Sequence, residues 1–186
     1  MPGTTPLGIH YPLGSEVPKV APDMQTLATD VDTLLRWPRA SVYFGSASAS
    51  RTPSVWQVIG TLTANHLLGM SISNSTRLNV LTAGIYRVQA SLLFAAAASP
   101  FGNRRGVMIR KNSADDPATG TQIAQSVWAQ FQAGAPSNAY AAGDFACNAG
   151  DYLQMFSFHD AGAAINLTGA SPSASFLTAS YLGPLT

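Results

Sequence analysis

The chain has 186 residues, which is the length of one domain of about 150 residues with an additional segment. Lys and Arg total 10 and Asp and Glu total 9, and the resulting net charge of +1 excludes a protein that binds nucleic acid through a basic surface. Charged residues make up 10% of the sequence, whereas an ordinary soluble domain has about 25%. Because so few charges give a weakly solvated surface, we expect the protein to bury much of that surface in an oligomer.

The sequence predicts neither a signal peptide nor a membrane span. The first residues, MPGTTPLGIHYPLG, lack a basic segment followed by an apolar run. No stretch reaches the roughly 18 apolar residues of a membrane helix, so we expect no membrane insertion. The single cysteine, Cys147, excludes an intrachain disulfide, and its small apolar neighbours predict that it is buried.

Residues 1–20 are predicted to form an extended arm, because the prolines and glycines in this segment disfavour helix. Apolar residues alternate along it, and they are Leu7, Ile9, Tyr11 and Leu13. The alternation fits a strand-like arm lying on its own domain, or an anchoring arm that docks on another protein. We favour the anchor, since a plain linker needs no such apolar row.

Residues 21–37 are predicted to form a helix. Pro22 and Asp23 suit its first turn, and Trp37-Pro38 ends it. Its apolar residues step by four and three, and they are Val20, Met24, Leu27, Val31 and Leu34. This spacing is typical of a coiled-coil seam, although two heptads are too short to be stable alone. The helix either packs on its own domain or bundles around a symmetry axis, and the narrow seam favours a bundle with Met24, Leu27, Val31 and Leu34 at the interface.

Residues 38–186 are predicted to form an all-β domain. Short alternating runs separated by Gly, Pro, Asn and Ser indicate strands at 41–44, 56–62, 76–81, 85–94, 106–110, 122–132, 139–147, 152–158 and 175–182. In 85–94 one face carries Tyr86, Val88, Ala90, Leu92 and Phe94. In 122–132 one face carries Ile123, Val127, Ala129 and Phe131. A tight turn before 85–94 is expected to need the permissive backbone of Gly84.

Several of these strands carry apolar residues on both faces. In 152–158, Tyr152 and Phe156 are on one face of the strand and Leu153 and Met155 are on the other. In 175–182, Phe176 and Leu177 are likewise on different faces. One face of such a strand fills the core, and the other needs a cover, for which a neighbouring subunit is the expected source. Tyr152 and Phe156 are therefore predicted at a subunit interface.

The sequence predicts no catalytic, metal or cofactor site. The histidines, His10, His66 and His159, lie far apart, and His159 is expected at a solvated strand end. Asp115-Asp116 and Arg104-Arg105 are expected in exposed turns, and Asp144 and Asp151 are expected to bond backbone amides. With no nucleophile, phosphate-binding or dinucleotide motif in the sequence, we expect a protein that is not an enzyme.

Four segments follow one another along the strand-rich part of the chain. They are TRLNVLTAGIYRVQASLLF (76–94), MIRKNS (108–113), NAGDYLQMFSF (148–158) and SASFLTASYLG (173–183). In this order they resemble strands of the tumour-necrosis-factor-like (TNF-like) superfamily, which includes the globular heads of complement, and Gly84 and Tyr86 match its G-x-Y motif. The resemblance covers residues 40–186 and implies a jelly roll that forms a tight homotrimer, with Tyr86 near the threefold interface.

Residues 4–35 have the sequence TTPLGIHYPLGSEVPKVAPDMQTLATDVDTLL. This segment resembles the opening of tail-associated proteins of phages that infect actinobacteria, in which a P-L-G-x-x-Y-P-x-G-S arm precedes an M-Q-x-L-A-x-x-V-D helix. The resemblance implies a virion protein whose arm, through Leu7, Ile9, Tyr11 and Leu13, anchors it to other virion proteins. No segment between Trp37 and Ala40 could form a shaft, so the expected spike is short.

We therefore expect an all-β, TNF-like jelly-roll sandwich at 38–186, trimeric, preceded by an extended anchoring arm at 1–20 and a helix at 21–37. The expected function is that of a structural bacteriophage virion protein, a short spike or minor tail protein, assembled in the host cytoplasm and exposed on the particle. A capsid decoration protein or head fibre is one alternative. Another is a module that binds a host-surface glycan through loops at 99–103, 115–120 or 160–171.

Overall fold

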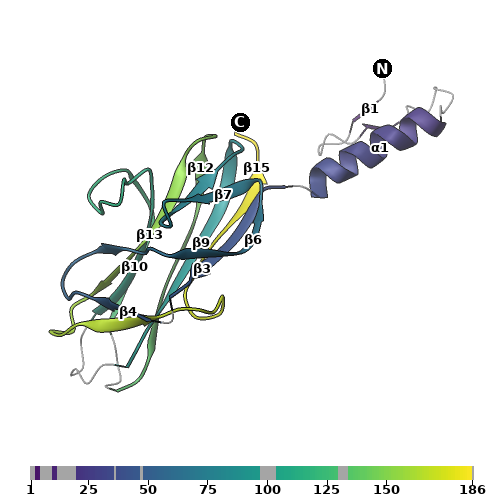
Figure 1. Ribbon diagram of the computed structural model, residues 1–186. Helices are drawn as coiled ribbons and strands as arrows, with labels where there is room; N and C mark the ends of the chain where they lie inside the picture. The colour runs from purple at the N-terminus through teal and green to yellow at the C-terminus, as the bar shows by residue number, and fades with distance from the viewer. Residues whose placement is uncertain are drawn as a thin grey trace. The chain divides into compact units, whose positions relative to one another are not determined.

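The chain divides into two units, Met1–Trp37 and Pro38–Thr186, and each is described by itself. The structure, a computed structural model, describes residues 3–4, 10–11, 20–35, 37–46, 48–96, 104–129 and 134–185. No helix within these ranges is long and apolar enough to cross a membrane. The elements of both units are labelled in Figure 1.

The first unit contains one helix and a short antiparallel ladder. Strands β1 (Gly3–Thr4) and β2 (His10–Tyr11) pair with Gly3 opposite Tyr11. Helix α1 spans Val20–Leu35, so it begins one residue before and ends two residues before the predicted bounds. Pro22 and Asp23 lie in its first turn, where the missing N–H does no harm and a negative charge faces the positive helix end.

The second unit is all-β. Its strands are β3 (Arg39–Phe44), β4 (Ser48–Arg51), β5 (Gln57–Val58), β6 (Leu62–Leu68), β7 (Met70–Ser73), β8 (Arg77–Val80), β9 (Gly84–Phe94), β10 (Arg104–Lys111), β11 (Thr121–Ala129), β12 (Ser137–Cys147), β13 (Tyr152–His159), β14 (Ile165–Thr168) and β15 (Phe176–Gly183). The predicted all-β class is confirmed. The prediction missed β4, β7 and β14, which have four residues each and too few alternating apolar positions to be recognised. It also missed β6 apart from its first residue, Leu62.

The strands form two antiparallel sheets. In the first, called the β10 sheet, the order is β11-β10-β13-β8-β7, and β5 also pairs with β13. In the second, called the β9 sheet, β6, β3, β15, β9 and β12 lie side by side, and β14 and β4 extend it beyond one end of β15. Strands distant in sequence are thus neighbours, such as β3 beside β15.

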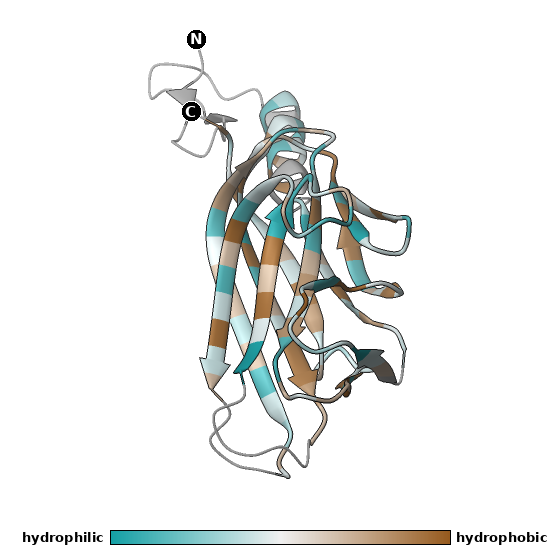
Figure 2. Ribbon diagram, turned by 90° about the vertical axis from the view of Figure 1, so that its left-hand side faces the viewer, coloured by the Kyte–Doolittle hydropathy of each residue, from teal (hydrophilic) through white to brown (hydrophobic). Residues whose placement is uncertain are grey.

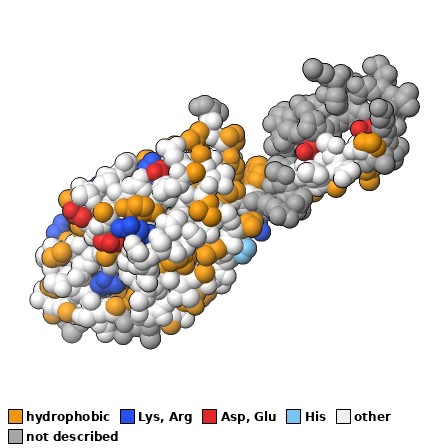
Figure 3. Space-filling model, turned by 45° about the horizontal axis from the view of Figure 1, so that its top comes forward, with side chains coloured by type: hydrophobic (Ala, Val, Ile, Leu, Met, Phe, Trp, Pro, Cys, Tyr) orange, Lys and Arg blue, Asp and Glu red, His pale blue; other side chains and the backbone are white. Residues whose placement is uncertain are grey.

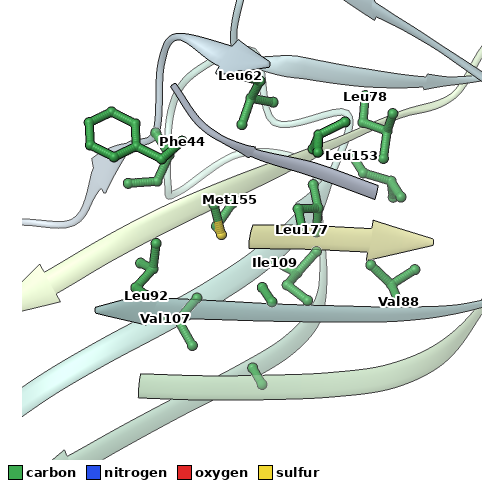
Figure 4. Packing of buried hydrophobic residues seen from close by; sticks show 14 of the residues in the cluster. Phe44, Leu62, Leu78, Val88, Leu92, Val107, Ile109, Leu153, Met155 and Leu177 are labelled. Carbon is green, nitrogen blue, oxygen red and sulfur yellow. The ribbon is translucent and has the colours of Figure 1, made fainter. Parts of the chain in front are cut away.

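The core lies between the two sheets. Along β9 the predicted face of Tyr86, Val88, Ala90, Leu92 and Phe94 is fully buried, as expected. Figure 2 shows the matching alternation of hydrophobic and hydrophilic residues along the long strands. Val88, Leu92 and Leu177 of the β9 sheet meet Ile109, Leu153 and Met155 of the β10 sheet (Figure 4). Cys147 is also buried in this core, as predicted.

The predicted facing of β11 is wrong because of a β-bulge. Ile109 of β10 lies opposite Ala124, but the next residue, Arg110, lies opposite Gln122, so Ile123 is the extra residue of the bulge. Beyond the bulge the two faces are exchanged relative to simple alternation. Val127 consequently lies opposite Gly106 and is exposed, whereas Ile123, which alternation had placed on the same face, packs against the core.

The predicted exposure of Arg105 and His159 is also wrong. Arg105 lies in β10 on the side of Val107 and Ile109, directly opposite His159 of β13, and both side chains are buried. The Arg105 guanidinium lies 5.9 Å from the centre of the Phe94 ring, and its Nη1 donates to the Arg104 carbonyl at 2.9 Å. Because side chains alternate along a strand, both side chains point into the sandwich at one of its ends. Arg105 had been expected in an exposed turn and His159 at a solvated strand end.

Candidate self-association surface

The β9 sheet has one face on the core and the other on the outside of the sandwich. Side chains alternate along each strand, so the ladder registers determine which outward residues share a row across the strands. Successive rows on this outward face differ in their chemistry, and one of them is a candidate surface for self-association.

The first of these rows is aromatic. Tyr140 of β12 lies opposite Ser91 of β9, which in turn lies opposite Phe176 of β15. Phe176 lies opposite Tyr43 of β3. Tyr140 is 43% exposed and Tyr43 and Phe176 are half-buried, whereas Ser91 is buried between them. The three aromatic residues, called the aromatic row, give the outward face an apolar strip that crosses four neighbouring strands.

A charged row runs parallel to the aromatic row. Arg87 of β9 lies opposite Asp144 of β12, and its Nε and Nη2 donate to the two carboxylate oxygens at 2.8 Å each. The hydrogen bond from Arg87 lowers the pKa of Asp144. Farther along, Arg39 of β3 donates from Nε to Nε2 of His66 at 3.1 Å. These groups are exposed to water, so both contacts stabilise the fold little, and only the Arg87–Asp144 contact pairs opposite charges.

A second exposed apolar surface lies on β11. This strand is the edge of the β10 sheet, and β12 is its neighbour across the side of the sandwich. The two strands approach closely, since a Cβ on Gly143 of β12 would lie 3.3 Å from the carbonyl oxygen of Ile123. Trp128 is 56% exposed, and Val127, whose side chain points to the opposite face of the strand, is also exposed. An edge strand with two exposed apolar residues is a candidate site of association with another chain.

Charged side chains are sparse on the face of the sandwich turned to the viewer in Figure 3, and acidic groups there lie next to basic ones. Asp160 pairs with Arg104 at 2.6 Å, and Lys111 pairs with Asp151 at 3.1 Å.

Tyr86, which the resemblance placed near a threefold interface, lies inside the core. Its hydroxyl donates to the Thr82 carbonyl at 2.8 Å, and its ring meets that of Tyr181 edge-on at 5.4 Å. Burial raises the pKa of Tyr86 to about 12. The side chain offers no exposed area to a second copy, so an effect on the interface would act through its neighbours, and the predicted role stays a prediction.

Phe156 and Tyr152 lie on the outward face of the β10 sheet, and other residues of the same chain cover part of this face. Phe156 is buried opposite Met108. Tyr152 lies under the Arg77 guanidinium at 4.4 Å, and its hydroxyl accepts from the Ala114 backbone N–H at 2.9 Å. The second apolar face of β13 therefore finds part of its cover within the same chain, and the predicted interface role of both residues stays untested.

The predicted helix seam is exposed. Met24, Leu27 and Val31 of α1 are 61%, 39% and 41% exposed. Leu34 lies in the same helix, but its side chain falls outside the described part of the chain. Of the predicted anchor residues, Leu7, Ile9 and Leu13 lie outside the described residues, and Tyr11 is described only as part of β2.

The carboxylates of the sandwich hold its loops. Burial alone would raise the pKa of Asp151, but hydrogen bonds from Asn112, Asn148 and Lys111 outweigh this effect and lower it. Asp151 thus accepts from a backbone amide, as predicted, whereas Asp144 pairs with Arg87. Burial raises the pKa of the Cys147 thiol to about 11. Within the described ranges, no group of three His, Cys, Asp or Glu residues is placed to hold a metal ion.

Asp115 and Asp116, expected in one solvated turn, have different surroundings. Asp115 accepts from Thr76 at 2.8 Å and from the side-chain amide of Gln154, and it faces Arg77 at 3.7 Å. Asp116 accepts from the Ala118 backbone N–H at 2.8 Å, which is the role of a turn residue. Asp115 therefore ties its loop to the sheet.

The aromatic row is not visible in the amino-acid sequence. The pattern showed Phe176 on the second face of its strand, but Tyr43 and Tyr140 had no visible relation to it. The relation depends on the registers β12–β9, β9–β15 and β15–β3, which join segments far apart in the chain. Only the paired strands bring the three side chains into one row.

No protein-family model and no curated protein matches this sequence. Solved structures match the fold. The Eiger TNF of S. frugiperda superposes with a TM-score of 0.58 at 12% identity, over 80% of this chain and 96% of that chain. Murine APRIL at pH 8.0 gives 0.56 at 16% identity, over 77% and 99%, and at pH 5.0 it gives 0.54 at 14% identity, over 78% and 99%. The second unit is therefore a TNF-like jelly roll, and at these identities the likeness shows the fold alone.

Proposed function

We propose that this protein is a structural virion protein of a bacteriophage: a short homotrimeric spike or minor tail protein that displays a jelly-roll knob and is anchored by its N-terminal arm. The fold and the low charge support the trimeric knob. The resemblance of residues 4–35 to the opening of phage tail-associated proteins supports the anchor and the place on the particle. The function is one of assembly and display, without catalysis.

The aromatic row is the observation that carries the trimer. A ring of three copies closes through a heterologous interface, in which one surface of a copy meets a different surface of the next copy. The outward face of the β9 sheet offers the aromatic row, and the β11 edge offers Val127 and Trp128. We propose that the β11 edge of each copy packs on the aromatic row of the next, which covers both apolar surfaces at once.

The trimer is tested by light scattering on the purified chain. The expected mass is three times the 19.4 kDa of one copy. Tyr140→Glu places a charge in the aromatic row and is expected to weaken assembly at least about tenfold, which corresponds to about 1.4 kcal/mol. Leu81→Glu adds the same charge at another exposed apolar residue and is the control, expected to remain trimeric. A single 19.4 kDa species of the unmodified chain at micromolar concentration would overturn the trimer.

The place on the particle is tested separately. Particles of the encoding phage are purified by density gradient, and their proteins are identified by mass spectrometry. Peptides of this chain at structural copy number support a virion protein, and their presence only in the soluble lysate would overturn it. Cryo-electron microscopy of the same particles then distinguishes attachment to the tail from decoration of the capsid.

A further inference from the structure

The apolar seam of α1 is exposed in the part of the chain that the structure describes. Met24, Leu27 and Val31 follow one another by three and four residues and therefore lie on one side of the helix. All three side chains are exposed, so the described residues of the same chain leave the seam open to solvent. Leu34 continues the seam by its spacing. A helix with such a stripe needs a partner of similar shape.

The two flanks of the seam differ in charge. Asp23 and Asp30 precede Met24 and Val31 by one residue and form one flank, whereas Ala28 follows Leu27 on the other. Val20–Leu35 contains three acidic residues and no basic one. An antiparallel pair would set the acidic flanks of both helices against each other, and like charges at that distance repel. A parallel pair sets the acidic flank of one helix against the Ala28 flank of the next.

The symmetry of the proposed trimer favours the same orientation, and the link to the sandwich is short. Residues 36–38 separate the end of α1 from Arg39, the first residue of β3. Three residues span at most about 11 Å. A threefold axis relates the three copies by rotation, so it gives the three helices the same direction along the axis.

We propose that the α1 helices of three copies pack in parallel around the axis of the trimer, with Met24, Leu27 and Val31 of each copy facing those of the other two. The inference rests on the proposed trimer. Two heptads do not hold together alone, so the sandwiches supply the association and the helices add contacts at the high local concentration that the short link creates. The bundle gives the three N-terminal arms a common origin and direction.

Cysteine cross-linking of the full chain tests the bundle. Met24→Cys and Val31→Cys are prepared separately and oxidised under mild conditions, and covalent dimers are followed on a non-reducing gel. In a parallel bundle each introduced cysteine lies next to the same cysteine of a neighbouring copy. A disulfide can form there, because it needs Cα atoms within about 7 Å of each other. In an antiparallel pair that brings residue 24 to itself, the two residues 31 lie 14 positions apart, or about 21 Å along the axis. Both variants cross-link only if the helices are parallel.

The controls use the same chain. Thr29→Cys lies on the side of α1 away from the seam and is exposed. Cys147 of the unmodified chain is buried and its thiol has a raised pKa, so it contributes no background. We expect both seam variants to cross-link at least about tenfold faster than Thr29→Cys, as the local concentration within a trimer implies.

The outcomes separate this inference from the proposed trimer. A trimer by light scattering in which neither seam variant exceeds Thr29→Cys overturns the helix bundle and leaves the trimer intact. A trimer in which one seam variant alone cross-links overturns the parallel arrangement. A monomer overturns the proposed trimer and with it the bundle.

Discussion

Gly84 is confined by its surroundings, although its backbone is ordinary. The sequence suggested a turn that needs a permissive backbone, yet Gly84 is the first residue of β9 and is not among the glycines with positive φ. A Cβ on Gly84 would meet the ring of Tyr181 and would lie 2.7 Å from the carbonyl oxygen of Gly183. The requirement is one of space between β9 and β15, which a local sequence pattern does not show.

Gly84→Ala is therefore expected to destabilise the sandwich by about 1–3 kcal/mol, the usual range for overpacking a tight site. The free energy of unfolding is measured by urea titration. Gly183→Ala is the matched control, because a Cβ there meets nothing within 4 Å. If both variants unfold at the urea concentration of the parent, the close approach of Tyr181 to Gly84 is wrong.

His159 makes the stability of the sandwich depend on pH. Its Nε2–H donates to the Arg51 carbonyl at 2.8 Å, and its Nδ1 accepts from the Ala161 backbone N–H at 3.4 Å. The ring is thus held neutral. Burial lowers its pKa, and the nearby charge of Arg105 lowers it further, whereas the bond to Arg51 and the charge of Asp160 oppose this. In the unfolded chain the His159 ring binds a proton near about pH 6.5, and in the folded chain it does so only at lower pH. The free energy of unfolding therefore falls as the pH drops below about 6.5.

The expected result is a melting temperature that decreases between about pH 7.5 and about pH 5, a range that lies above the usual titration of Asp. His159→Gln keeps an amide that can donate to Arg51 and removes the titration, so its melting temperature should change less over this range. His66→Gln, at an exposed position, is the control and should keep the slope of the parent. An unchanged slope in His159→Gln would contradict the assignment.

At the scale of elements, the loop after β10 is fixed to the β10 sheet by one buried amide. The Gln154 oxygen accepts from the Ser113 hydroxyl at 2.7 Å and from the Asp115 backbone N–H at 3.1 Å, and its nitrogen donates to Thr76 at 3.2 Å. Asn112, Ala114 and Asp115 all have positive φ. A loop in this conformation needs such contacts to keep its shape.

Gln154→Ala leaves the Ser113 hydroxyl and the Asp115 amide without their acceptor. Because unsatisfied buried polar groups are costly, we expect a loss of about 2–3 kcal/mol in the free energy of unfolding. Hydrogen exchange of 112–120 should become faster than in the parent, while β9 keeps its protection. Gln122→Ala, at an exposed position of β11, is the control. Equal exchange of the loop in both variants would show that Gln154 does not hold it.

Strand alternation is readable in the sequence, but its interruptions are not. The core face of β9 follows from the pattern of 85–94, because the regular alternation within this strand shows which of its side chains face the core. In β11 the bulge at Ile123 reverses the facing of every later residue, and only the pairing with β10 reveals it. The predicted strand 56–62 likewise divides into β5 and the start of β6, with Thr61 at positive φ between them.

At the scale of the whole molecule, the fold class was available from the sequence and most of the candidate surface was not. Alternation and the four segments 76–94, 108–113, 148–158 and 173–183 led to a TNF-like jelly roll. The aromatic row joins Tyr43, Tyr140 and Phe176, whose separation in the chain hides their adjacency. The helix seam was predictable, since its spacing is local, and its exposure is what the structure adds.

The last prediction concerns the division of labour between the two units. Pro38–Thr186 has its own core between two sheets, so deletion of Met1–Trp37 is expected to leave a folded β protein that still forms a trimer. The deleted chain should not enter particles assembled without the native copy. In the proposed anchor Leu7, Ile9, Tyr11 and Leu13 are expected to supply the apolar contacts, and three arms on one trimer are expected to bind far more tightly than one arm.

Incorporation is measured by quantitative mass spectrometry of purified particles complemented with each chain. The full-length variant Ile9→Ser distinguishes the contribution of the arm from that of the helix. It removes one apolar contact from each of three arms and should reduce incorporation. Thr5→Ser is the control and should not reduce it. The trimer, followed by light scattering, should be the same in all of these chains, because the aromatic row and the β11 edge lie within 38–186. If the deleted chain enters particles as well as the full chain does, the anchor lies in the jelly roll, and the first unit has a different task.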